Sequence, residues 1–138
     1  MNRMYDFDVI VIGAGPAGIF TALELTKLAP EKKVLVVDSG SSIDRRACPA
    51  RTSGKCAHCK TCGIMNGWAG AGAFSDGKLP LCEDVGGNIT DYMPVDRARE
   101  LIHYCDETYL RFGAPEEVFG LGDKFAEQIS YEARKENI

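Results

Sequence analysis

Residues 8–18 read Asp-Val-Ile-Val-Ile-Gly-Ala-Gly-Pro-Ala-Gly, and this stretch constrains the fold more than any other part of the chain. The continuous apolar run Val9–Ile12 is typical of a strand in a buried parallel sheet. Three glycines follow with the spacing G-x-G-x-x-G, which is typical of a phosphate-binding turn between a strand and a helix. The stretch therefore predicts a β-strand, a tight turn and the start of an α-helix.

Each glycine of this motif has a separate expected role. Gly13 lets the chain turn sharply off the strand, and Gly18 lets the helix pack closely against the sheet. Gly15 has no Cβ, so a pyrophosphate can approach the backbone there. Pro16 occupies the first helical position, where its missing N–H costs nothing, and is followed by Ala17. The helix N-terminus then offers free N–H groups and a partial positive charge to a phosphate.

The motif lies in the context that a dinucleotide site needs. An amphipathic helix pattern follows it, and a second apolar strand, Val34–Val37, ends on Asp38. This acid lies twenty residues after Gly18, where a carboxylate is expected to accept hydrogen bonds from the 2′-OH of an adenosine ribose. The alternative is a plain βαβ unit with a glycine turn.

The composition is that of one soluble globular domain. The chain has 138 residues, of which 45% are hydrophobic, and 16 basic against 20 acidic residues give a net charge of −4. This charge provides no basic surface for nucleic acid or an anionic membrane. No apolar run approaches the roughly 20 residues of a membrane span, and no basic leader precedes the first strand. We therefore expect a cytoplasmic protein.

Periodicity predicts an α/β fold with three segments. Residues 1–38 form a Rossmann-like βαβ unit, residues 39–91 a long loop rich in Gly and Cys, and residues 92–138 a helical segment. A helix is expected over 95–112, and a second one after Asp123 as its N-cap. Apolar residues at helical spacing are expected to face inward on these helices: Ala98, Leu101, Ile102, Cys105, Tyr109, Phe112, Phe125, Ala126, Ile129 and Ala133.

The predicted parallel sheet is incomplete. A doubly wound sheet needs more than two strands, because helices cover a parallel sheet on both faces. The last residues have a helical pattern, after which another strand would be expected. We therefore expect the chain to be the N-terminal part of a larger dinucleotide-binding domain, truncated and inactive by itself.

Four of the six cysteines lie within fifteen residues, a second strong signal. In a cytosolic chain such clusters are more often ligands or redox groups than disulfides. The C-x-x-C spacing lets two thiolates reach one centre, which favours zinc or an iron–sulfur cluster. A redox dithiol and a set of reduced thiols packed as small hydrophobes stay open as alternatives. The candidate metal ligands are Cys48, Cys56, Cys59 and Cys62.

Residues 67–78 contain four glycines and three alanines in twelve positions. A backbone with so few side chains can lie against a flat or phosphorylated ligand and donate N–H groups to it. The flanking Trp68 and Phe74 argue against a freely exposed turn, and Lys78 can meet a phosphate. We expect this segment to contact the ligand.

The stretch 8–18, with Pro-Ala between its second and third glycines, resembles the FAD fingerprint of the glutathione-reductase-like flavoproteins. Together with the cysteine and glycine motifs, from Cys48-Pro49 to Gly77-Lys78, it resembles more narrowly a bacterial family of FAD-dependent dehydrogenases. These are NAD(P)/FAD-dependent oxidoreductases of unassigned substrate. The resemblance covers residues 6–80 well and the later helices loosely. In that family a substrate domain interrupts the FAD domain, so the resemblance also implies an N-terminal fragment.

The resemblance implies an FAD-dependent oxidoreductase with residues in named roles. The glycine motif would hold the FAD pyrophosphate, and Asp38, followed by Ser39, would meet the adenosine ribose. Ala71, Gly72 and Ser75 would approach the flavin or its ribityl chain. NAD(P)H is the implied electron donor, and the implied partner is a small-molecule substrate or electron acceptor.

Two other functions remain open at this stage. One is an NAD(P)-binding dehydrogenase domain, and the other is a metal- or iron–sulfur-binding electron-transfer module that uses the βαβ unit as a scaffold. The sequence shows no Ser-His-Asp set and no paired carboxylates, so it gives hydrolysis no support. It identifies no catalytic acid or base.

Overall fold

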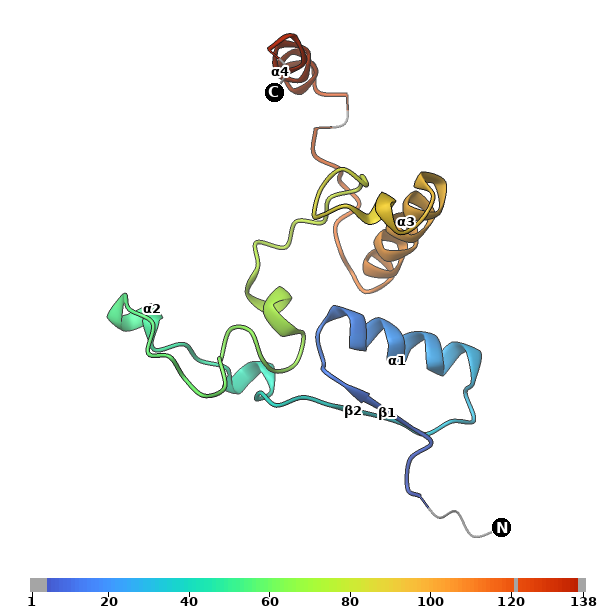
Figure 1. Cartoon of the computed structure of the whole chain (residues 1–138), viewed down its shortest axis with the longest axis vertical. Helices are drawn as coiled ribbons and strands as arrows, with labels where there is room; N and C mark the ends of the chain where they lie inside the picture. Colours follow the sequence, from blue (N-terminus) through green and yellow to red (C-terminus); the bar gives the residue numbers. More distant parts are fainter. Residues whose placement is uncertain (1–4, 121, 137–138) are drawn as a thin grey trace. The chain divides into compact units, whose positions relative to one another are not determined.

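The computed structural model describes residues 5–120 and 122–136. The chain forms two compact units, Met1–Lys78 and Leu79–Ile138, each of which is described by itself. The first unit contains a parallel two-stranded sheet with helices, and the second is helical (Figure 1).

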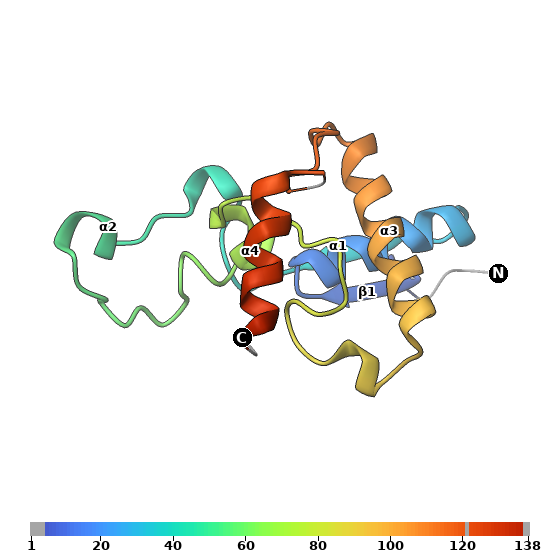
Figure 2. The same cartoon turned by 90° about the horizontal axis from the view of Figure 1, so that it is seen from above.

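The first unit is built on the predicted βαβ arrangement. It consists of β1 (Val9–Ile12), α1 (Pro16–Leu28) and β2 (Val34–Val37). The two strands are parallel, and each residue of β1 pairs with one residue of β2. Helix α1 contacts both strands and runs along the sheet (Figure 1 and Figure 2). The fold is therefore an incomplete Rossmann-like α/β unit, as the apolar runs and the glycine motif predicted.

Exposure alternates along β1, because successive side chains of a strand point to opposite faces. Val9 and Val11 are half-buried, whereas Ile10 and Ile12 are 59% and 88% exposed. Val11 also lies close to Gly18 of α1. The half-buried valines therefore face α1, and the exposed isoleucines lie on the opposite face of the sheet.

The predicted loop over 39–91 contains short helical turns and is divided between the two units. Its first part contains η1 (Ile43–Arg45), α2 (Ala50–Ser53) and η2 (Gly70–Phe74), and belongs to the same unit as the sheet. The boundary between the units follows Lys78, inside the predicted loop.

The second unit contains η3 (Ile89–Asp91), α3 (Val95–Arg111) and α4 (Lys124–Lys135). The helix expected over 95–112 is confirmed, and α3 contacts η3. The predicted N-cap is also confirmed, because the Asp123 carboxylate accepts a hydrogen bond from the N–H of Phe125 at 2.8 Å.

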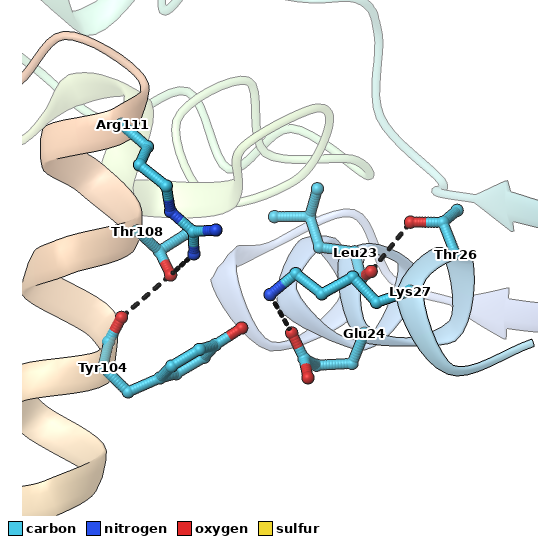
Figure 3. A network of polar contacts seen from close by, with 7 residues as sticks. All are labelled: Leu23, Glu24, Thr26, Lys27, Tyr104, Thr108 and Arg111. Carbon is cyan, nitrogen blue, oxygen red and sulfur yellow. Dashed lines mark hydrogen bonds and ion pairs between the residues drawn. The ribbon is translucent and has the colours of Figure 1, made fainter.

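Polar side chains make local contacts along the helices of both units (Figure 3). In α3, the Thr108 hydroxyl donates to the Tyr104 carbonyl at 2.8 Å and accepts from Arg111 at 2.9 Å. In α1, Lys27 forms an ion pair with Glu24 at 2.7 Å. Side-chain pairs three residues apart, such as Lys27 with Glu24 and Arg111 with Thr108, stabilise individual helices, whereas a threonine hydroxyl bonded to a carbonyl four residues earlier does not.

The inward positions expected on the two later helices are only partly correct. Ala98 is fully buried, but Tyr109 and Phe112 are 40% and 73% exposed, and Phe125 and Ile129 of α4 are 70% and 53% exposed. Helical spacing predicts an amphipathic helix but does not predict what covers its apolar face. Within the described ranges, no helix combines the length and apolar character that crossing a membrane requires.

Replacing Gly18 with alanine is expected to destabilise the first unit. An ideal Cβ at Gly18 would lie only 1.9 Å from the carbonyl oxygen of Gly13. The start of α1 and the glycine turn would therefore have to move apart. Overpacking of this kind costs about 1–3 kcal/mol or more, which outweighs the gain in helix propensity of about 1 kcal/mol. Urea unfolding followed by circular dichroism measures the change.

Gly15→Ala is the matched control for this prediction. Gly15 has φ −77°, and the heavy atom nearest to an added Cβ is the Cα of Gly70 at 4.0 Å. The control should therefore lose much less stability than Gly18→Ala. Equal losses for the two variants would contradict the assignment of Gly18 to close helix–turn packing.

Candidate functional site

Two glycines of the motif are required by the chain's own geometry. Gly13 has φ +104°, a conformation that favours glycine, and its N–H donates to the Val37 carbonyl at 2.7 Å. Gly18 leaves room for the Gly13 carbonyl, as described above. The turn thus joins the end of β1 to the end of β2 and brings the start of α1 close to both.

Gly15 is different, because no contact within residues 5–120 and 122–136 requires a glycine there. Its φ of −77° and ψ of −177° are open to any residue, and an added Cβ would meet no heavy atom closer than 4.0 Å. Gly15 is also the N-cap of α1, and Pro16 is its first residue. The N–H groups of Gly15, Ala17 and Gly18 therefore have no acceptor within the helix. This arrangement leaves room and hydrogen-bond donors for an anionic group.

The Asp38 carboxylate connects three segments of the first unit. One oxygen accepts from the N–H of Ala14 at 2.9 Å, and the other accepts from Gly40 at 2.8 Å and Gly67 at 2.6 Å. Hydrogen bonds from the backbone N–H groups of Ala14 and Gly40 are the main reason why the pKa of Asp38 lies below its ordinary value. Gly67 and the charge of Arg46 add to the effect, which partial desolvation opposes. Asp38 therefore holds the glycine turn, β2 and the glycine-rich segment together as a carboxylate.

The glycine-rich segment lies against the glycine turn (Figure 1, where η2 is drawn in green beside the start of α1). The N–H of Ala69 donates to the Ala14 carbonyl at 2.8 Å. An ideal Cβ at Gly70 would lie 3.1 Å from the Cα of Gly15, so the two backbones approach closely. Two stretches that sequence patterns marked for ligand contact, residues 8–18 and 67–78, are far apart in the sequence and form one surface.

The remaining residues predicted to bind the cofactor are exposed on or near this surface. Ala71 and Gly72 belong to η2, and an added Cβ at Gly72 would lie 3.8 Å from Pro16. The Ser75 hydroxyl donates to the Gly72 carbonyl at 3.0 Å. Ser39 follows Asp38 and accepts a hydrogen bond from the Asn66 side chain at 3.1 Å.

Sequence patterns did not identify Arg46, a buried cation in the first unit. Its side chain donates to the carbonyls of Gly63 at 3.0 Å, of Trp68 at 2.6 Å and of Ile64. Its guanidinium carbon also lies 4.7 Å from the centre of the Phe74 ring, and the residue is only 8% exposed. In the sequence Arg46 is one of several basic residues in a loop, and no spacing pattern separates it from the others.

A polar cavity of about 210 Å³ lies beside Arg46 and Cys62. Hydrogen bonds from the N–H groups of Met65 and Ile64 lower the pKa of the Cys62 thiol, and the charge of Arg46 acts in the same direction. The cavity is also lined by other polar side chains, including Ser39, Arg45 and Asn66.

The four-cysteine metal centre is not supported. Cys56 and Cys59 are exposed, whereas Cys48 and Cys62 are half-buried. Among residues 5–120 and 122–136, no group of three or more His, Cys, Asp or Glu side chains is arranged to hold a metal ion. Where the chain leaves the cysteine stretch, at Gly63, it is held by Arg46 and by a close backbone contact with Ala47, neither of which involves a thiol. Close spacing along the sequence did not bring the thiols to one centre.

Asp38→Asn is expected to loosen the first unit and remove an acid-dependent part of its stability. Because the pKa of Asp38 is lowered in the folded state, its stabilisation is complete above the ordinary value of 3.8 and is lost as the pH falls through the lower folded-state pKa. The Asn side chain has one acceptor oxygen, and its NH2 group cannot accept from a backbone N–H. The variant should therefore be less stable than wild type near pH 6, and its stability should depend less on acid pH. Thermal unfolding at several pH values, with Asp44→Asn as control, measures this. Parallel pH profiles for wild type and Asp38→Asn would contradict it.

Comparison with known protein families finds a match in the first unit. Residues 8–54 match the family model described as FAD binding domain, a range that includes β1, α1, β2 and α2. No curated protein and no solved structure matches the chain. The match covers the glycine turn and Asp38, and it supports an FAD-binding oxidoreductase.

Proposed function

We propose that this chain is the FAD-binding part of a dehydrogenase, holding the ADP portion of FAD at the glycine turn, the start of α1 and Asp38, and its flavin side along the glycine-rich segment. NAD(P)H is the proposed electron donor, and a small-molecule substrate or electron acceptor is the proposed partner. The family match to residues 8–54 supports the FAD-dependent oxidoreductase class in general.

The observation that carries the proposal is the geometry at Gly15. A glycine stands where the backbone conformation accepts any residue and where a Cβ would have room inside the chain. A bound ligand explains why position 15 is a glycine, because a side chain there would occupy the space of the ligand. The N–H groups at the start of α1 and the positive end of its dipole suit a pyrophosphate. The residues present therefore fit FAD.

Asp38 also fits the proposal. A carboxylate has about four acceptor positions, and three are used by the N–H groups of Ala14, Gly40 and Gly67. Among the residues that the structure describes, one Asp38 oxygen accepts from Ala14 alone, and it keeps one position for a hydroxyl of the adenosine ribose. The same side chain would then hold the turn in shape and recognise the nucleoside.

The protein's part in the reaction is to bind and orient the cofactor. When bound, FAD supplies an isoalloxazine ring that accepts hydride or electrons. The glycine turn and α1 would hold the pyrophosphate, and Asp38 with Ser39 the ribose. Ala71, Gly72 and Ser75 would lie along the flavin side of the cofactor. These exposed, small residues restrict the approach of a large planar group very little.

Gly15→Val is expected to abolish FAD binding without unfolding the protein. The side chain would occupy the space proposed for the pyrophosphate, so the affinity should fall at least about 100-fold, which corresponds to about 2.7 kcal/mol. Titration of the purified protein with FAD, followed by quenching of flavin fluorescence, measures the affinity. Circular dichroism checks the fold.

Two controls sharpen this experiment. Thr26→Val introduces the same β-branched side chain near the far end of α1 and should leave the affinity unchanged. Parallel titration with NADH separates FAD from a nicotinamide cofactor. Retention of wild-type FAD affinity in Gly15→Val would refute the phosphate site, and tighter binding of NADH than of FAD would favour the NAD(P) alternative.

A further inference from the structure

Arg46 is a buried cation whose three hydrogen bonds all go to main-chain carbonyls. A buried guanidinium normally needs a carboxylate partner or several good hydrogen bonds to offset its desolvation. Here Nε, Nη1 and Nη2 each bind a different carbonyl, and the nearby Asp38 adds a favourable charge interaction. All three guanidinium nitrogens are thus used, and because the five-donor fork is rigid and planar, it holds the three carbonyls in one fixed arrangement.

The three carbonyls belong to the segment that leads into η2. Gly63 and Ile64 lie at its start, and Trp68 immediately precedes Ala69, which donates to the glycine turn. The guanidinium lies over the ring of Phe74, which is the last residue of η2. Arg46 therefore contacts the beginning, middle and end of residues 63–74.

The backbone near Arg46 is packed too closely for larger residues. An ideal Cβ at Gly67 would lie 2.4 Å from the Ser41 carbonyl oxygen and 3.0 Å from the Arg46 side chain. At Gly63 it would lie 2.3 Å from the carbonyl oxygen of Ala47. Both contacts join the segment 63–74 to the stretch on either side of Arg46. The position of the segment is therefore set by backbone contacts around one side chain.

We infer that Arg46 is a positioning residue: it holds residues 63–74 against the glycine turn, so that the surface contacting the flavin side of FAD is formed before the cofactor binds. This inference rests on the proposed function. Arg46 itself acts through the carbonyls of Gly63, Ile64 and Trp68 and through the Phe74 ring.

The inference predicts different effects on two nucleotides. ADP needs only the turn, α1 and Asp38, whereas FAD also needs residues 63–74. Arg46→Met, which removes the charge and the fork, and Arg46→Lys, which keeps the charge but not the planar fork, should both weaken FAD binding on the order of tenfold or more. The affinity for ADP should change less than about threefold, which corresponds to about 0.7 kcal/mol of binding free energy.

Trp68 provides a readout that does not depend on any cofactor. It is the single tryptophan of the chain, and its carbonyl accepts from Arg46. Without ligand, both Arg46 variants should show a shifted Trp68 emission maximum and stronger quenching by acrylamide. Arg51→Met is the matched control, because Arg51 lies 4.9 Å from the centre of the same Phe74 ring but is exposed. An exposed cation–π contact predicts at most about a fivefold change in FAD affinity.

The outcomes separate the inference from the function on which it rests. Wild-type FAD affinity and Trp68 quenching in Arg46→Lys and Arg46→Met would overturn the role of Arg46 alone. Equal losses of ADP and FAD would also overturn it, because Arg46 would then support the whole unit. Arg46→Lys decides the test if Arg46→Met does not fold by circular dichroism. Wild-type protein that binds neither nucleotide would overturn the proposed function and, with it, the role toward FAD.

Discussion

The carboxylate of Asp38 is the interaction on which the candidate site depends. Its three N–H partners come from the glycine turn, from the chain just after β2 and from the start of the glycine-rich segment. Without this side chain, three backbone segments would each present an N–H group to the same space. Charge-assisted hydrogen bonds to a carboxylate are stronger than neutral ones, so one residue can order a region that has few apolar side chains.

Arg46 complements this arrangement with the opposite charge. Asp38 gathers N–H groups, whereas Arg46 gathers carbonyl groups, and both act on the segment around Gly67 and Trp68. Backbone groups that a helix or sheet would pair internally are thus satisfied by two side chains. This explains how a long loop without strands holds a defined path beside the sheet.

The βαβ unit and the helix boundaries could be predicted from the sequence because they depend on local patterns. The apolar runs, the glycine spacing and the cap at Asp123 each reflect interactions among near neighbours. The meeting of the glycine-rich segment with Gly15 and the role of Arg46 could not be predicted, because both depend on contacts between distant residues. The cysteine spacing leaves a metal centre unsupported for the same reason: it describes distances along the chain and not the fold that brings ligands together, and no ligand group of three or more is found among the described residues.

The scarcity of buried apolar side chains has a thermodynamic consequence. Among the described residues, Ala14 and Ala98 are the only hydrophobic residues classed as buried. The heat capacity change of unfolding grows with the apolar area that unfolding exposes, so it should be small for a chain of this length. The curve of stability against temperature should then be only weakly curved. A ligand that binds only the folded form would raise the melting temperature in proportion to the logarithm of its concentration, which makes calorimetry a sensitive assay for cofactor binding.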